Sequence, residues 1–256
     1  MSRRILLTGA TQGLGEAIAR GLDSLGHQTF LVARDQDKLE QLKEELSHAA
    51  VAAVDLGQPD QLSGVVELAV SRLGGLDALI NNAGTIEPIG PVGSLTPLEW
   101  EQALRVNLTA PALLMAAALP YLQESRGRVV NISSGAAVKP TKGWGAYCAA
   151  KAGLLALSNV LTLEESGIAC FSLRPGVIDT GMQQRIRSSQ SMPSDAQERF
   201  LELHQKGELE PPEVPARAAI WLALQGPFER SGEFIEYKDS QIQAGVTALF
   251  SCDPLL

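Results

Sequence analysis

The stretch RILLTGATQGLG, residues 4–15, decides the fold class. Its apolar first part predicts a buried strand, and the amphipathic pattern that runs from Gly13 to Leu25 predicts a helix directly after it. The glycines Gly9, Gly13 and Gly15 allow a tight turn and let the backbone approach a pyrophosphate that rests on the helix N-terminus. A glycine-rich turn that binds nothing is the alternative. The strand before the turn and the helix after it favour phosphate binding.

The same alternation of apolar runs and amphipathic segments continues along the chain. Further strands are predicted at 29–32, 51–54, 78–80, 128–132, 168–173 and 233–236, and helices at 36–47, 58–72, 97–122, 146–165 and 212–224. Strands that alternate with helices form parallel sheets, whose ligands bind at the carboxyl ends of the strands. We therefore predict an α/β fold: a single Rossmann-type, doubly wound domain over residues 1–256, with a seven-stranded parallel sheet and helices on both faces.

Two segments depart from this pattern. Residues 183–210 are polar and rich in Ser, Gln and Glu, and we expect them to form one or two short helices that cover the site as a mobile substrate lid. The tail, residues 244–256, contains Phe250 and a terminal Leu-Leu pair. It is expected either to pack against a partner subunit or to fray.

Composition narrows the class of protein. The 256 residues are 45% hydrophobic and carry a net charge of −8, which argues against the basic face that a nucleic-acid-binding protein needs. The start of the chain has too few apolar residues for a signal peptide, and the longest apolar stretch, 110–119, contains Pro111 and is too short to span a bilayer. Three scattered cysteines imply no disulfide framework, and three histidines lie too far apart for metal-ligand spacing. A cytoplasmic protein without a metal site is therefore expected.

Tyr147 and Lys151 stand four residues apart in a segment expected to be helical, so both side chains project from one helix face. A phenol has a pKa near ~10 and transfers protons poorly at neutral pH unless a nearby cation stabilises its anion. Lys151 could supply that cation. An ordinary surface contact between the two side chains is the alternative reading of the pair alone.

Several further motifs occur in a fixed order around this pair. They are Thr8-Gly9-x-x-x-Gly13-x-Gly15, Asp55-Leu56, Asn81-Asn82-Ala83-Gly84, Asn107, Asn131-Ile-Ser-Ser134, Tyr147-x-x-x-Lys151 and Arg174-Pro175-Gly176 to Thr180. With these motifs the sequence resembles the short-chain dehydrogenase/reductase family over almost its whole length. The resemblance implies an oxidoreductase that uses a nicotinamide cofactor.

The resemblance also implies four catalytic positions, Asn107, Ser134, Tyr147 and Lys151. Tyr147 would give a proton to a carbonyl oxygen as hydride arrives, and Ser134 would hydrogen-bond that oxygen. Lys151 would lower the pKa of Tyr147 and bind the nicotinamide ribose, and Asn107 would hold a water that links Lys151 to solvent. Ser133 competes for the serine role, but the spacing of thirteen residues to Tyr147 favours Ser134, and strand neighbours alternate faces.

The end of the second predicted strand decides the form of the cofactor. Ala33 stands where relatives that bind NAD carry an acidic residue, and the guanidinium of Arg34 can pair with a 2′-phosphate. We therefore expect NADP(H). The alternative is that Arg34 is a solvated loop residue and Asp35 takes the acidic role. By resemblance, the cofactor would contact Gly9, Thr11, Gln12, Gly13, Leu14, Gly15, Ala33, Arg34, Asp55, Leu56, Asn82, Ala83, Gly84, Tyr147, Lys151, Pro175, Gly176, Val177 and Thr180.

Within the family, the chain is similar to sepiapterin reductase and its microbial relatives, which reduce vicinal dicarbonyls such as benzil. The runs that carry this similarity include Asp179-Thr-x-Met182-Gln183-Gln184 and Ser231-Gly232-x-x-x-Glu236-Tyr237. Glu236 takes the place of an aspartate that anchors the pterin, one methylene longer. The substrate is expected to contact Ser134, Trp144, Tyr147, Gly176, Met182, Gln183 and Glu236. For Trp144, Met182 and Gln183, simple packing is the alternative.

Three other functions fit the sequence less well. A serine hydrolase would need a G-x-S-x-G elbow, which neither Ser133 nor Ser134 has. A broad-specificity or 3-oxoacyl-type reductase is the alternative within the enzyme class, and an NADPH-sensing regulator that catalyses nothing is the alternative outside it. The apolar helices at 104–119 and 146–163 predict, by resemblance, a homodimer or homotetramer. The expected partner is a small-molecule carbonyl substrate. No nucleic-acid or membrane partner is expected.

Overall fold

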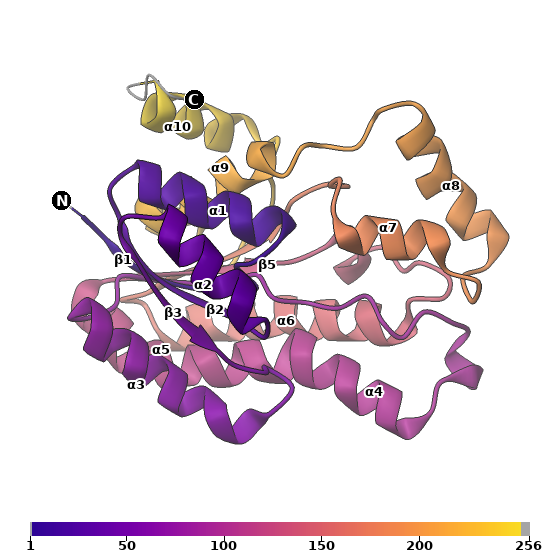
Figure 1. Cartoon of the computed structure of the whole chain (residues 1–256), viewed down its shortest axis with the longest axis horizontal. Helices are drawn as coiled ribbons and strands as arrows, with labels where there is room; N and C mark the ends of the chain where they lie inside the picture. The colour runs from indigo at the N-terminus through magenta and orange to yellow at the C-terminus, as the bar shows by residue number, and fades with distance from the viewer. Residues whose placement is uncertain (1, 252–256) are drawn as a thin grey trace.

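A parallel sheet of seven strands forms the centre of the protein, whose computed structural model describes residues 2–251 (Figure 1). The strand order is β3-β2-β1-β4-β5-β6-β7, so the order reverses between β1 and β4. The strands are β1 Arg4–Thr8, β2 Gln28–Ala33, β3 Ala49–Ala53, β4 Ala78–Asn81, β5 Arg128–Ile132, β6 Ala169–Arg174 and β7 Phe234–Glu236. The predicted fold class, a seven-stranded doubly wound α/β sheet, is confirmed.

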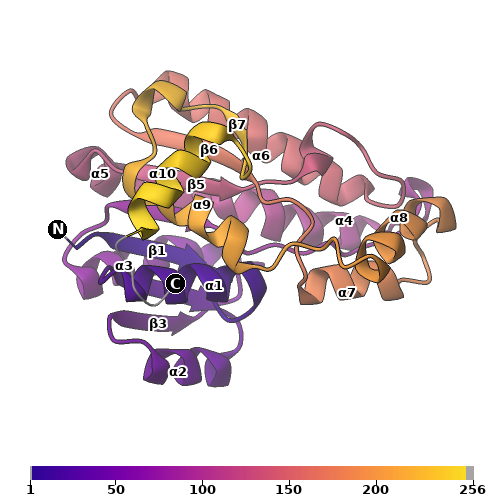
Figure 2. The same ribbon diagram turned by 90° about the horizontal axis from the view of Figure 1, so that it is seen from above.

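Helices cover both faces of this sheet (Figure 2). One face is covered by α1 Gly13–Ser24, α2 Gln36–Glu45, α9 Glu213–Gln225 and α10 Ser240–Phe250. The other is covered by α3 Leu62–Leu73, α5 Ala110–Ser125 and α6 Gly145–Glu164, and α4 Pro97–Leu104 leads into α5. Short 3₁₀ turns lie at Pro59–Gln61, Val92–Ser94, Gly135–Ala137 and Phe228–Arg230. Each helical layer buries its apolar stripe on the sheet and forms a separate hydrophobic core.

The helix predicted at 97–122 is interrupted, because Arg105–Thr109 is a π-helix. Pro111 explains the interruption. Proline has no N–H to donate to the carbonyl of Asn107, four residues earlier, and its ring would clash with that carbonyl in a regular α-helix. The wider turn relieves the clash, and the Ala110 N–H bonds to the carbonyl of Arg105 instead. Turns of this kind often occur at functional sites.

The two helices Pro97–Ser125 and Gly145–Glu164 are long and apolar enough to cross a membrane, with a mean hydropathy of 1.3 each. Their buried side chains, among them Leu114, Ala118 and Leu154, belong to the core beneath the sheet. Packing on the sheet therefore accounts for the buried part of their apolar character, which is 39% of the apolar window in each helix.

The C-terminal segment differs from its prediction. Residues 240–250 form α10, which packs on α9 and buries Ile242, Val246 and Phe250 in the core of its own chain. The side chain of Asp239 starts the helix by accepting hydrogen bonds from the backbone N–H groups of residues 241 and 242. The described part of the tail thus packs within its own chain, instead of fraying or packing against a partner subunit as expected. Residues 252–256 lie outside the described range.

The polar segment after β6 forms two helices, α7 Gly181–Ser188 and α8 Ser194–Gln205, as expected, and Figure 2 shows them together at one end of the molecule. The ends of this α7–α8 segment are fastened to each other. The Asp179 N–H donates to the carbonyl of Glu210 at 2.9 Å, and the Glu210 N–H donates to the carbonyl of Val177 at 2.9 Å. Both ends of the segment therefore leave the body of the protein at one point.

Candidate active site

A large cleft opens at the carboxyl ends of the strands, between the glycine loop after β1 and the α7–α8 segment. Its volume is about 1530 Å³, above the ~300–1,000 Å³ usual for one small ligand, so it has room for a dinucleotide and a second molecule. The predicted cofactor residues all line it: Gly9, Thr11, Gln12, Gly13, Leu14, Gly15, Ala33, Arg34, Asp55, Leu56, Asn82, Ala83, Gly84, Tyr147, Lys151, Pro175, Gly176, Val177 and Thr180.

The glycine loop is held in a shape that requires glycine. Gly9 and Gly13 have positive φ angles of +69° and +53°. A Cβ atom on Gly15 would lie 2.0 Å from the carbonyl oxygen of Gly9. The amide nitrogen of Asn82 donates to the carbonyls of Thr8 and Gly9 at 3.0 and 3.1 Å. The side chain of Asn82 thus supports the loop, and its contact with the cofactor stays a prediction.

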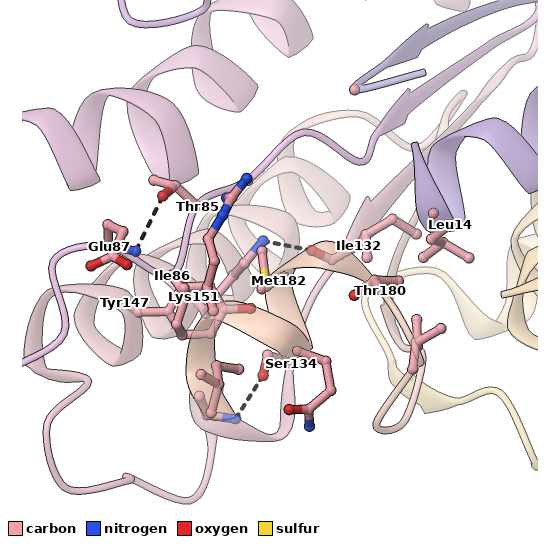
Figure 3. Close-up of a pocket in the computed structure, with 18 of the residues that line it drawn as sticks. Leu14, Thr85, Ile86, Glu87, Ile132, Ser134, Tyr147, Lys151, Thr180 and Met182 are labelled. Atoms are coloured by element: carbon pink, nitrogen blue, oxygen red, sulfur yellow. Dashed lines mark hydrogen bonds between the residues drawn. The ribbon is translucent and has the colours of Figure 1, made fainter. Parts of the chain in front are cut away.

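Ser134, Tyr147 and Lys151 come together at the middle of the cleft (Figure 3). Tyr147 is 7% and Lys151 4% exposed, so the pair is not a surface contact. The Lys151 ammonium lies 5.8 Å from the centre of the Tyr147 ring and donates to the carbonyl of Ile132 at 2.7 Å. Ser134 lies beside the phenol, and its hydroxyl accepts the Ala136 N–H at 3.1 Å. The hydroxyl of Ser133 is buried without a partner in the described residues, which leaves Ser134 as the serine that faces Tyr147.

Asn107 lies behind this group and does not line the cleft. It is fully buried within the π-helical turn, where its amide donates to the carbonyls of Thr85 and Ala103 at 2.9 and 3.0 Å. Its oxygen accepts the Thr85 N–H at 3.0 Å. The side chain therefore fixes the loop after β4 beside Lys151. Both amide protons of Asn107 are thus bonded, so a water that links Lys151 to solvent would bond to an oxygen of Asn107, on the backbone or on the side chain.

At the adenosine end, Arg34 is exposed and lines the cleft. Asp35 also lines it, but its carboxylate begins α2 by accepting the Lys38 N–H at 3.1 Å. That bond gives Asp35 a structural role, which weakens the alternative in which Asp35 binds a ribose. Lys38, in the first turn of α2 after Ala33, also lines the cleft. It was not predicted from the sequence. Asp55 accepts the Gly57 N–H at 2.9 Å and closes the turn after β3.

At the opposite end, aromatic and apolar side chains form the wall of the cleft. Trp144 stacks on Phe200 of α8, with ring centres 5.2 Å apart, and meets the edge of Tyr147 at 5.8 Å. Met182 and Gln183 of α7 line the same region, as predicted, and Figure 3 shows Met182 close to the catalytic group.

Glu236 does not line the cleft, contrary to its prediction as a substrate contact. It forms an ion pair with Arg174, which does line the cleft and which sequence reasoning did not single out. Because β6 and β7 pair Arg174 directly with Glu236, the carboxylate is neutralised at the sheet edge. A free carboxylate for a pterin is therefore not present at this position.

Comparison with known proteins agrees with this geometry. A family model described as short chain dehydrogenase matches residues 3–191. The chain belongs to the short chain dehydrogenase family. Sepiapterin reductase of Rattus norvegicus is 38% identical over 91% of this chain and 96% of the relative. The benzil reductase ((S)-benzoin forming) of Bacillus subtilis is 34% identical over 86% of this chain and 93% of the relative. A crystal structure of actinorhodin polyketide ketoreductase with NADPH superposes with a TM-score of 0.82, at 26% identity over 92% of this chain and 95% of the other.

This short chain dehydrogenase is therefore an oxidoreductase that uses a nicotinamide cofactor, which supplies the hydride when it is bound. The residues present fit such a group: the loop leaves no room for a Cβ atom at Gly9 or Gly15, and the N-terminus of α1 faces the cleft. Gly9, Gly13 and Gly15 would hold the pyrophosphate, and Lys151 the nicotinamide ribose.

Burial sets the protonation of the catalytic pair. It raises the pKa of Tyr147 to about 12, with the hydrogen bond from Ser134 acting in the opposite direction. Burial also lowers the pKa of Lys151 to about 8. The pKa of Tyr147 is thus raised overall, because loss of solvent destabilises the phenolate. That Lys151 lowers this pKa stays a prediction. At pH 7 the phenol is protonated and the amine is charged, which suits proton donation to a carbonyl.

These pKa values predict how reduction depends on pH. The lowered pKa of Lys151 means that the ammonium is fully present below about pH 8 and is lost above it. We expect kcat/KM for ketone reduction to be constant from pH 6 to 7 and to fall about tenfold per pH unit well above pH 8. Initial rates from pH 6 to 10 with saturating cofactor measure this. A profile that stays flat to pH 10 would contradict the assignment of Lys151.

Proposed function

We propose that this short chain dehydrogenase is an NADP(H)-dependent carbonyl reductase whose substrate is a vicinal dicarbonyl. Tyr147 gives its proton to one carbonyl oxygen, and Ser134 binds that oxygen as negative charge develops. The Lys151 ammonium offsets the negative charge that is left on the Tyr147 oxygen. The products are an α-hydroxyketone and the oxidised cofactor. The observation that carries the proposal is the Ser134–Tyr147–Lys151 group, with Tyr147 and Lys151 buried, in a cleft that also has an aromatic wall.

Two cationic side chains support NADP(H) over NAD(H). Arg34 lies at the end of β2 with no acidic residue at Ala33, and Lys38 lines the same part of the cleft. A guanidinium and an ammonium suit a 2′-phosphate. The NADPH of the ketoreductase structure and the names of the two reductases agree with this choice and with a carbonyl substrate.

The proposal is tested by following cofactor oxidation with sepiapterin, benzil, 1-phenyl-1,2-propanedione and a 3-oxoacyl thioester. We expect turnover of the two diketones with NADPH. The pairing of Glu236 with Arg174 predicts that sepiapterin is the poorer substrate, since no free carboxylate is left for the pterin. Turnover of the thioester alone would contradict the dicarbonyl assignment and leave the carbonyl reductase chemistry in place.

Replacing Arg34 with alanine is expected to raise KM for NADPH by about 10–100-fold and to leave KM for NADH within a factor of about three. The reason is that only NADPH carries the phosphate, and a hydrogen bond to a charged group contributes about 1.5–3 kcal/mol. Steady-state kinetics with both cofactors measure the change. Arg72→Ala, on the exposed last turn of α3, is the matched control. An equal loss with both cofactors would contradict the role of Arg34.

The proposal includes a homodimer or homotetramer in the cytoplasm, with substrate entry gated by the α7–α8 segment in one continuous domain. Exposed apolar side chains on α5 and α6 support self-association: Leu113 is 39%, Val160 44% and Leu163 87% exposed. Cys148 and Cys170 are free thiols, as is usual in a reducing compartment.

A further inference from the structure

Two buried polar side chains at the aromatic end of the cleft have no hydrogen-bond partner in the described residues. Gln183 is 3% exposed, and neither its amide oxygen nor its amide nitrogen is bonded. Trp144 is 7% exposed, and its indole N–H is not bonded either. Both side chains line the cleft. Buried polar groups are almost always paired in native proteins, so an unpaired set in a cleft needs an explanation.

Packing alone does not explain these groups. Gln183 stands one turn before Ile186 on α7, whose side chain belongs to an apolar cluster with Met192 and Phe200. An amide at this position adds nothing to apolar packing, and its burial removes the water molecules that would otherwise hydrogen-bond it. Some buried amides are bonded within the chain: the amide of Asn131 donates to Ser158 at 2.9 Å and accepts from Asn81 at 2.8 Å. The Asn81 oxygen and the Ser133 hydroxyl lack a partner among the described residues, but Gln183 differs because both of its polar atoms are unbonded and it lines the cleft. The partner of Gln183 is therefore expected to come from outside the chain.

The positions of the two side chains indicate which part of a substrate they reach. The Trp144 and Tyr147 rings meet edge to face, and Gln183 follows Met182, which packs against the apolar cluster that contains both rings. An oxygen next to the reacting carbonyl would thus enter a region with two N–H donors, one on the amide and one on the indole. The amide oxygen can accept a hydrogen bond instead if that neighbouring group is a hydroxyl.

We propose that Gln183 and Trp144 bind the second oxygen of the vicinal dicarbonyl, while Ser134 and Tyr147 bind the oxygen of the carbonyl that is reduced. The inference rests on the proposed function and deepens it. It makes Gln183 and Trp144 specificity-determining residues, since a simple ketone leaves both donors unpaired. Reduction then stops at one carbonyl: hydride adds to its carbon, the Tyr147 proton goes to its oxygen, and the second C=O is unchanged.

A comparison of matched substrates tests this inference. Benzil and deoxybenzoin carry the same two phenyl rings, and a CH₂ group of deoxybenzoin replaces the second carbonyl of benzil. Gln183→Met keeps the length of the side chain and removes both polar atoms. We expect this variant to lower kcat/KM for benzil by about 10–100-fold and to change kcat/KM for deoxybenzoin by less than about threefold. Gln184→Met is the control, because Gln184 is exposed and does not line the cleft.

A second variant keeps the test independent of one substitution. Trp144→Phe removes the indole N–H and retains a ring that can stack on Phe200, and it is expected to show the same selective loss for benzil. Equal losses for the two substrates in both variants would overturn the inference and leave the reductase function standing. Failure of the wild-type protein to reduce either ketone would overturn the proposed function and this inference with it.

Discussion

Replacement of Tyr147 with phenylalanine is expected to lower kcat/KM for ketone reduction by about a thousandfold. The phenol lies beside Ser134 within the cleft, and general acid catalysis by a positioned side chain contributes about 10²–10⁴-fold. The ring remains in Tyr147→Phe, so the contact with Trp144 and the binding of the cofactor should persist. Stopped-flow measurement of hydride transfer and fluorescence titration of NADPH separate the two effects.

Tyr121→Phe is the matched control for this prediction. Tyr121 is half-buried on α5 and packs against the core beneath the sheet, outside the cleft. This variant should keep full activity. Retention of more than a tenth of the activity by Tyr147→Phe would show that another group delivers the proton.

Replacement of Gly15 with alanine is expected to abolish cofactor binding and to destabilise the protein. The new Cβ atom would lie 2.0 Å from the Gly9 carbonyl oxygen and 2.5 Å from the amide nitrogen of Asn82, and both belong to the bonded framework of the loop. Overpacking against backbone cannot be relieved by rotating a side chain, so we expect a loss near the upper end of ~1–3 kcal/mol. Thermal unfolding with and without NADPH measures both consequences: a lower Tm, and no increase in Tm on adding the cofactor.

Gly64→Ala provides the comparison. Gly64 lies within α3, and a Cβ atom there would meet nothing within 4 Å. Alanine at an exposed helical position should raise stability by about 0.5–1 kcal/mol. If Gly15→Ala binds NADPH as tightly as Gly64→Ala does, the glycine loop is not the pyrophosphate site.

The sequence was sufficient to predict the sheet, because each strand is a short apolar run and each crossover helix has a clear amphipathic period. It was not sufficient to predict α10, because the apolar residues of this helix are explained only by their packing against α9. Gly245 illustrates the dependence: a Cβ atom there would lie 2.1 Å from the ring of Trp221, so the two helices approach each other closely. The contact joins segments whose pairing no local pattern indicates.

The candidate site divides in the same way. Motif spacing identified Ser134, Tyr147 and Lys151, which the fold brings together in the cleft. It did not indicate the burial that raises the pKa of Tyr147, because burial depends on what α6 and α8 pack against. It also placed Glu236 at the substrate, since the ion pair with Arg174 follows from strand register rather than from sequence order.

The fastened ends of the α7–α8 segment have a consequence for how selectivity can change. Both ends meet at hydrogen bonds among Val177, Asp179 and Glu210, so the segment is an excursion from one point of the scaffold. The length and composition of the segment can therefore change without changing the distance between the two points where it joins the rest of the protein. Phe200, Met182 and Gln183 belong to this excursion, while Trp144 and the proton donor Tyr147 belong to α6 and its N-terminus. An exchange of residues 181–209 would therefore change the Gln183 side of the acceptor site and leave Trp144 and the proton donor in place.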